Sequence, residues 1–379
     1  MKKLYFYCFC ICLLSSQAHA RQITDSEILL GKEQQLHSEI LNETQVLNLY
    51  LPKSFSEASD DHQYPVILLL EDEFFHLVTG IVQHLSSVNR MPESIVVSLK
   101  NGPVVPKLYT NKSDFWPEEW KQLPFGKSPD DFVKSLEKEL FPYLKKHYRA
   151  NDYRIVIGFS GTSIFALHAL AKEPDLFNAH IAIAAGDILG MGYEEGKSLI
   201  DVFEQNLIEN PDFKNKLYVT SAASDVEDAP MIGQNLMELQ RRLSKHKSEE
   251  FQFISKIYPN ENHYDVALPA LGEAFNLIFP KEKWSADYRE MSAEKGKALA
   301  NIDSFYAELS AYYGFSILPM AERWNSIYSL RWVGLDLLKQ ERIKEAIIVL
   351  ERRAHYRPNS IAALTDLSKA YERSGHKDK

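Results

Sequence analysis

Cysteine is almost absent from this chain of 379 residues. It has only three, and all lie within the first twelve positions: Cys8, Cys10 and Cys12. If that segment is removed after export, the remaining chain has no thiol. It can then form no disulfide, bind no metal through cysteine and use no cysteine nucleophile. We therefore expect its stability to come from the packing of an apolar core.

The sequence also lacks an apolar run of about 20 residues, which a membrane-spanning helix needs. Its most apolar stretch, residues 4–14, is shorter, follows Lys2 and Lys3, and precedes the small-x-small pattern Ala18-His19-Ala20. This order is that of a secretory signal peptide. We expect residues 1–20 to be cleaved off. Because no cysteine lies at the cleavage site, we do not expect a lipid anchor. The mature protein is predicted to be periplasmic or secreted, without a stable membrane anchor.

An excess of positive charge is missing as well. The formal net charge is −9, and the loss of Lys2 and Lys3 would make it −11. An acidic chain is not expected to bind nucleic acid or an anionic membrane surface as its main partner. Its hydrophobic content of 45% and charged content of 25% are those of an ordinary globular protein, and its length favours two domains.

Short apolar runs alternate with amphipathic segments through the first domain, which we expect to span residues 21–281. A hairpin is expected at 37–41 and 45–50, and buried strands at 65–70, 94–99, 155–157, 180–184, 216–220 and 251–258. Helices are expected at 74–85, 128–144, 162–170, 231–243 and 267–279, and a loop at 186–191. This alternation predicts an α/β fold with a mostly parallel sheet between helices, whose ligands bind at the carboxyl ends of the strands.

Residues 282–379 show no convincing strand pattern and are predicted to be a smaller all-α region. A period of about 34 residues is typical of tetratricopeptide repeats. The positions that fit it are Gly334, Ala346, Leu350 and Pro358, and the pattern restarts at Leu364, Leu367 and Tyr371. One and a half such repeats cannot bury a core of their own. We therefore expect this region to pack on the first domain or on a protein partner.

The stretch at residues 154–170 has the order of a nucleophile elbow: a buried strand, a sharp turn at a serine, and a helix. The turn is Gly158-Phe159-Ser160-Gly161, and the helix begins at Thr162. A serine in this turn stands out of the sheet, beside the free N–H groups of the helix. The alternative is a Gly-Ser turn without function, so the prediction depends on residues elsewhere in the chain.

A serine hydroxyl needs a base, and the base needs an acid that orients it. In this type of sheet the three follow in the order serine, acid, histidine. His263 lies between the last strand and the last helix, where the base is expected. His168, inside the elbow helix, is expected to pack or lie at the surface, whereas His76 could line the cleft.

The acid is expected just after the strand at 216–220. Asp225 is nearest to the strand end and is preferred, with Glu227 and Asp228 as alternatives. An oxyanion hole needs two N–H donors directed at the developing negative charge. We expect one from Gly161 and the other from Glu71 or Asp72, after the strand at 65–70.

Several blocks of the chain together resemble the Putative esterase family of α/β hydrolases, which includes esterase D-like and enterochelin-esterase-like enzymes. The resemblance covers about residues 33–281. Its blocks are Tyr64-Pro-Val-Ile-Leu-Leu-Leu70, Pro142-Tyr143, His147-Tyr148-Arg149, Tyr153-Arg-Ile-Val-Ile-Gly-Phe-Ser160, Pro174-Asp-Leu-Phe177, Glu261-Asn-His263 and Leu268-Pro-Ala-Leu271. It implies hydrolysis of carboxylic esters through an acyl-enzyme on Ser160, with His263 and Asp225 as partners. It implies neither a metal nor an organic cofactor. Some members carry a similar helical C-terminal region.

Three positions depart from the family pattern. Thr162 stands where the pattern Gly-x-Ser-x-Gly has its last glycine, Glu71-Asp72 replaces Asp-Gly, and residues 184–187 replace a segment with Ser-Pro-Ser and Trp. Thr162 and Asp72 motivate an alternative: a weak or inactive hydrolase scaffold whose helical C-terminal region binds a protein partner.

The segments expected to select the ester substrate are the loops 101–127 and 186–200, where the resemblance is poorest. The sequence does not name that ester.

Overall fold

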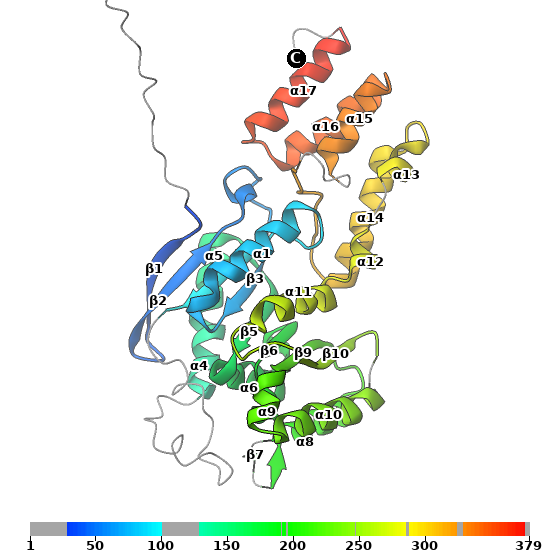
Figure 1. Cartoon of the computed structure of the whole chain (residues 1–379). Helices are drawn as coiled ribbons and strands as arrows, with labels where there is room; N and C mark the ends of the chain where they lie inside the picture. Colours follow the sequence, from blue (N-terminus) through cyan, green and yellow to red (C-terminus); the bar gives the residue numbers. More distant parts are fainter. Residues whose placement is uncertain are drawn as a thin grey trace, which may run out of the picture.

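The structure, a computed structural model, describes residues 29–100, 129–190, 192–194, 196–246, 248–285, 288–323 and 329–375. The predicted signal peptide and the loop 101–127 lie outside the described residues and stay predictions. A central sheet has helices on both faces, and a group of helices at the C-terminal end extends from it (Figure 1). In the described ranges, no helix has the length and apolarity to cross a membrane.

The central sheet has eight strands in the order β1-β2-β4-β3-β5-β6-β9-β10. They are β1 (Lys32–Ser38), β2 (Glu43–Tyr50), β3 (Tyr64–Leu69), β4 (Ile95–Leu99), β5 (Ala150–Phe159), β6 (Ala179–Ile183), β9 (Asn215–Ala222) and β10 (Phe251–Tyr258). The hairpin of β1 and β2 lies at one edge, and β2 pairs antiparallel with both β1 and β4. The other six strands of this sheet, β4-β3-β5-β6-β9-β10, pair in parallel. The predicted α/β fold with a mostly parallel sheet is confirmed.

Successive side chains of a strand point to opposite faces of the sheet, so each buried strand supplies two cores. On one face, Ile67 and Leu69 pack with α1 (Phe75–Ser87) and α11 (Ala267–Ile278). On the other face, Val66 and Leu68 pack with further helices. The helices of this second face are α4 (Pro129–Ser135), the π-helical turn η3 (Leu136–Leu140), α5 (Phe141–Tyr148), α6 (Ser163–Lys172), α8 (Leu199–Glu209) and α10 (Met231–Leu243).

The sequence-based prediction of a loop directly after β6 is wrong. Residues Gly186–Gly190 form the short helix α7, and β7 (Gly192–Glu194) pairs with β8 (Lys197–Ser198) before α8 begins. The helix forms because Ile188 and Leu189 are buried in the core beside α10, while the Gly186 N–H donates to Ser221 Oγ at 2.9 Å. The range 186–200 is therefore largely regular structure. Strand β5 also continues to Phe159, two residues past the predicted end.

The C-terminal helices pack on the first domain and share its core. They are α12 (Lys281–Trp284), α13 (Tyr288–Ala293), α14 (Ala298–Tyr313), α15 (Leu330–Lys339), α16 (Ile343–Tyr356) and α17 (Ile361–Arg373). Trp284 Nε1 donates to Tyr313 Oη at 3.0 Å, and that hydroxyl donates to the Ile278 carbonyl at 3.1 Å. A Cβ at Gly334 would lie 2.6 Å from Leu350 Cδ2, so a glycine lets α15 approach α16 closely. The domain boundary near residue 281 and the tetratricopeptide assignment stay predictions.

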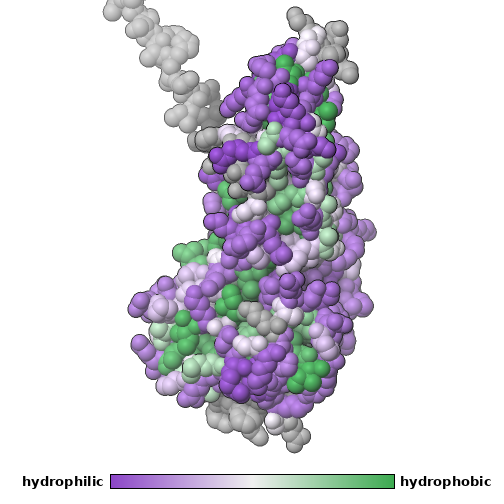
Figure 2. All heavy atoms as spheres, turned by 90° about the vertical axis from the view of Figure 1, so that its right-hand side faces the viewer, coloured by the Kyte–Doolittle hydropathy of each residue, from purple (hydrophilic) through white to green (hydrophobic). Residues whose placement is uncertain are grey.

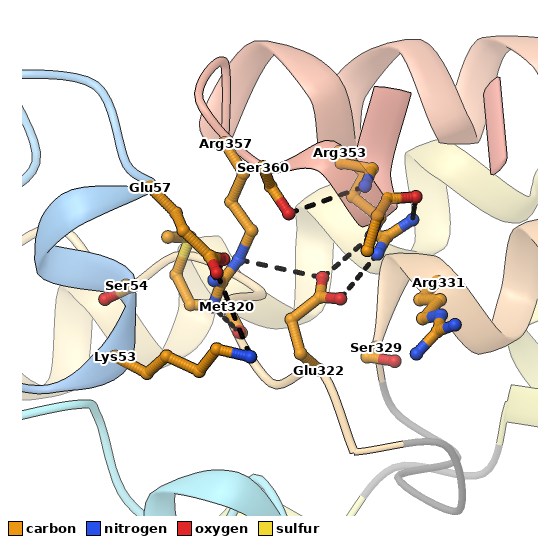
Figure 3. A network of polar contacts seen from close by, with 12 residues as sticks. Lys53, Ser54, Glu57, Met320, Glu322, Ser329, Arg331, Arg353, Arg357 and Ser360 are labelled. Atoms are coloured by element: carbon orange, nitrogen blue, oxygen red, sulfur yellow. Dashed lines mark hydrogen bonds and ion pairs between the residues drawn. The ribbon is translucent and has the colours of Figure 1, made fainter. Parts of the chain in front are cut away.

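Two buried arginines at the end of α16 form ion pairs, and one of them, Arg357, connects the C-terminal helices to the first domain (Figure 3). Arg353 contacts Glu322 at 2.5 Å and Asp366 at 2.9 Å, within the C-terminal region. Arg357 contacts Glu57 of the first domain at 2.6 Å. Seen from the right-hand side of Figure 1, hydrophilic residues predominate over the upper helical part, and hydrophobic patches are scattered below (Figure 2).

Candidate active site

The turn after β5 holds its serine in a strained backbone conformation. Strand β5 ends at Phe159, the turn η4 (Ser160–Thr162) follows, and α6 begins at Ser163. Ser160 has a φ of 50°, in the left-handed region that residues other than glycine rarely adopt. A Cβ at Gly158 would lie 2.6 Å from Ser163 Cα, so only glycine allows the strand and helix to approach this closely. Such strain persists only where the surrounding structure enforces it, and it is common at functional sites.

Three polar side chains that are far apart in the sequence meet at the carboxyl end of the sheet. His263 Nε2 lies 3.1 Å from Ser160 Oγ, and His263 Nδ1 lies 2.9 Å from Asp225 Oδ1. The second oxygen of Asp225 accepts the Ala222 N–H at 3.0 Å, which fixes the carboxylate at the end of β9. When Nδ1 donates to Asp225, Nε2 can accept the hydroxyl proton of Ser160. The structure therefore brings together the three residues that the sequence analysis selected.

The electrostatics of this group stabilise the charged form of the His263 imidazole relative to a free histidine. The hydrogen bond to Asp225 raises the pKa of His263 above its ordinary value of 6.5, and the negative charges of Asp225 and Asp187 add to this. Burial raises the pKa of Asp187 itself, and the Asp225 charge contributes in the same direction. The sequence analysis did not select Asp187. Its position could have indicated it, because Asp187 lies just after β6 and Asp225 was selected for lying just after β9.

The other candidates lie in different surroundings. Glu227 and Asp228 are exposed on α9 (Ala223–Asp228). His168 is buried in α6, where its Nδ1 lies 2.6 Å from Tyr193 Oη and burial lowers its pKa to about 4. His76 is exposed on α1.

The segment proposed for the second oxyanion donor lies beside the elbow. Phe74, which ends the turn η2 (Asp72–Phe74), packs its ring 4.7 Å from the ring of Phe159. The Asp72 carboxylate is held by neighbouring strands, since its Oδ1 accepts from Asn48 Nδ2 at 2.7 Å and from Ser98 Oγ at 2.5 Å. Burial, together with two neighbouring acids, raises the pKa of Glu71. The assignment of the oxyanion donors to Gly161, Glu71 or Asp72 stays a prediction.

Aromatic rings surround the base. The Phe159 ring packs edge-on against His263 at 5.5 Å and is stacked on Tyr264 at 5.6 Å. Tyr264 is 68% exposed, so it presents an apolar surface next to the histidine. Among the described residues, no group of three or more His, Cys, Asp or Glu side chains is placed to hold a metal ion.

Comparisons with known proteins agree with this architecture. The model of the Putative esterase family matches residues 38–255. The IroE-like serine hydrolase of Shewanella oneidensis has a similar structure, with a TM-score of 0.62, 19% identity, and coverage of 91% of this chain and 99% of that one.

Two further solved structures match about two thirds of the chain. The BES protein of Bacillus cereus gives a TM-score of 0.54 at 19% identity, covering 68% of this chain and 99% of its own. The siderophore hydrolase EstA of Aspergillus nidulans gives 0.55 at 16% identity, covering 68% and 98%. At these identities the likeness shows the fold. None of the curated proteins matches the chain in sequence. Since the family model covers more than half of its length, the chain belongs to the Putative esterase family, the hydrolases of esters that are built on the α/β-hydrolase fold.

Proposed function

We propose that this protein is a serine carboxylic-ester hydrolase that works through an acyl-enzyme. The observation that carries the proposal is the continuous chain of hydrogen bonds from Ser160 through His263 to Asp225. A serine alone is a poor nucleophile at neutral pH, and this chain of contacts is what activates it in hydrolases of unrelated folds.

In the first half of the reaction, His263 Nε2 takes the hydroxyl proton while Ser160 Oγ attacks the ester carbonyl. The tetrahedral oxyanion is stabilised by the Gly161 N–H and by a second N–H at Glu71 or Asp72. His263 then gives its proton to the alkoxide oxygen, which leaves as the alcohol, and Ser160 holds the acyl group. In the second half, His263 takes a proton from a water that attacks the acyl carbonyl. The bond between the acyl group and Ser160 Oγ then breaks, His263 returns the proton to Ser160 Oγ, and the acid is released.

Asp225 has two tasks in this scheme. It keeps the imidazole in the tautomer whose Nε2 faces the serine, and its charge stabilises the imidazolium that forms during the attack. The same interaction with Asp225 raises the pKa of His263.

Two features motivated the alternative of an inactive scaffold, and both are engaged in hydrogen bonds. The hydroxyl of Thr162 bonds to the backbone of Phe159, and the carboxylate of Asp72 bonds to Asn48 and Ser98. These contacts support the catalytic proposal over the scaffold.

The decisive experiment removes the nucleophile. We expect Ser160→Ala to lower the hydrolysis of nitrophenyl acetate by about 10³-fold or more and to abolish labelling by a fluorophosphonate probe. Ser163→Ala, at the first residue of α6, is the matched control, because the buried Ser163 hydroxyl donates to the Ile183 carbonyl at 3.0 Å. Wild-type hydrolysis by Ser160→Ala would show that another residue carries the reaction.

Two further proposals rest mainly on the sequence. We propose export through residues 1–20, which mass spectrometry of the periplasmic protein tests: a mature chain that begins at Arg21 is expected. We also propose that the C-terminal helices bind a protein partner, since on α17 Ile361 is 83% exposed and Leu364 is 48% exposed. A double substitution of these two by glutamate should abolish capture of that partner and leave ester hydrolysis unchanged. Retained capture would contradict it.

A further inference from the structure

The side chain of Thr162 folds back onto the end of β5. Its Oγ1 accepts the Phe159 N–H at 2.8 Å and donates to the Phe159 carbonyl at 2.8 Å. Thr162 is only 3% exposed, and so is Phe159, so these bonds are shielded from water. One hydroxyl therefore satisfies both backbone polar groups of the residue that precedes Ser160.

The topology of the sheet explains why Phe159 needs such a partner. The Leu70 N–H donates to the Ile157 carbonyl at 2.9 Å, and the last paired residue of β3 is Leu69, opposite Ile157. Backbone groups two residues apart on a strand point to the same side. Those of Phe159 therefore point toward β3 at a place where β3 has already ended. Buried backbone groups are rarely left unpaired, and the Thr162 hydroxyl is the partner here.

The two bonds also span the strained residue. Thr162 and Phe159 lie on either side of Ser160 and Gly161, and Ser160 is the one with a φ of 50°. Gly161 has no side chain with which to restrain the turn. The hydroxyl thus links the residues on either side of Ser160 and Gly161 and restrains the backbone of Ser160, whose Oγ lies 3.1 Å from His263 Nε2.

We propose that Thr162 is a positioning residue, whose hydroxyl holds the elbow in the conformation that directs Ser160 Oγ at His263. The inference rests on the proposed function, because it requires Ser160 to be the nucleophile. It gives a role to the position at which this chain departs from the Gly-x-Ser-x-Gly pattern: the threonine replaces the freedom of a glycine with a hydrogen-bonded constraint.

The test uses the full chain with three substitutions. Thr162→Val keeps the shape and removes the hydroxyl, whereas Thr162→Ser and Thr162→Ala differ from one another only by the hydroxyl oxygen. With nitrophenyl acetate, we expect Thr162→Val and Thr162→Ala to lower kcat and the acylation burst rate by about tenfold to a hundredfold, because a small misplacement of a reacting atom costs that much. KM should change by less than about twofold, and Thr162→Ser should restore most of kcat.

Thermal unfolding of each variant separates positioning from a purely structural role. A structural role lowers Tm and leaves kcat of the folded protein unchanged at temperatures well below Tm. The inference is overturned if Thr162→Val or Thr162→Ala keeps the wild-type kcat, or if Thr162→Ser is as slow as Thr162→Ala. Should Thr162→Val fail to fold, the serine and alanine pair decides alone.

Ser160→Ala, measured in parallel, tells the two proposals apart. If Ser160→Ala is inactive and every Thr162 variant has the wild-type kcat, only the positioning role of Thr162 fails. If Ser160→Ala retains full activity, the proposed nucleophile itself is wrong.

Discussion

The contact of Arg357 with the first domain leads to a quantitative prediction of stability. Arg357 follows α16 and its side chain is 3% exposed. Its guanidinium lies 2.6 Å from Glu57 and 3.6 Å from Glu322 (Figure 3). The Glu93 carboxylate lies 3.7 Å from the same guanidinium. Arg357 Nη2 also donates to the Met320 carbonyl at 2.5 Å. Replacement by methionine keeps much of the apolar stem and removes the charge.

The expected cost follows from what the substitution leaves behind. Three carboxylates that are at most 22% exposed lose a cation, and breaking a buried ion pair in this way costs about 3–5 kcal/mol. Glu322 keeps its contact with Arg353, so we expect the lower end, about 3 kcal/mol. Urea unfolding at neutral pH measures it, because urea does not screen ion pairs as an ionic denaturant does.

The pH dependence of this loss provides a second check. Burial raises the pKa of Glu93, and Arg357 opposes that shift. Without Arg357 the pKa of Glu93 rises further, so the folded variant takes up a proton at a higher pH than the folded wild type does. A protonated carboxyl does not need the cation, and the difference in unfolding free energy between the two proteins should therefore shrink as the pH falls through that range.

Arg352→Met is the matched control, on the same helix and also in an ion pair. Arg352 lies 2.7 Å from Asp303, but both side chains are about one-third or more exposed, so a loss of at most about 1 kcal/mol is expected. A loss for Arg357→Met that is no larger than the control, or one that grows at low pH, would refute the reasoning.

Two further predictions concern the elbow and the base. Because the pKa of His263 is raised and its neutral form is the base, the hydrolysis rate should rise with pH at a midpoint above 6.5. Asp225→Asn should lower the pKa of His263, which NMR titration measures, and should lower kcat on the order of 10⁴-fold. An unchanged midpoint would contradict this. Gly158→Ala would place a Cβ 2.6 Å from Ser163 Cα and should cost about 1–3 kcal/mol in thermal unfolding, together with activity. Gly272→Ala in α11, where a Cβ meets open space, is the control and should stabilise the protein by about 0.4–1 kcal/mol. Equal changes in unfolding free energy for Gly158→Ala and Gly272→Ala would contradict the prediction.

The sequence predicted the elements whose pattern is long and local. Helix α10 and strand β10 have the predicted bounds, because an amphipathic run of 13 residues and a run of eight residues rich in aromatic and β-branched side chains leave little ambiguity. The short helix α7 was missed for the opposite reason. Five residues are too few to show a helical period, and its stability comes from the burial of Ile188 and Leu189 beside α10.

The order of Ser160, an acid and His263 along the chain was also readable from the sequence, since each follows a strand at the same edge of a parallel sheet. For the acid, the sequence favoured Asp225 and left Glu227 and Asp228 as alternatives. Asp225, Glu227 and Asp228 share one short helix, and only its placement at the end of β9 brings the Asp225 carboxylate to 2.9 Å from the imidazole.

Two features were decided by tertiary structure alone. The sequence showed a threonine where a glycine was expected, but only the end of β3 leaves Phe159 with backbone groups for the Thr162 hydroxyl to bind. Likewise, an apolar helical pattern shows that the C-terminal region must bury a face, and it does not say against what. Trp284 and Tyr313 bury their rings in the core shared with the first domain. The sequence could not predict this contact, because it depends on the shapes of two surfaces that are formed by residues far apart in the chain.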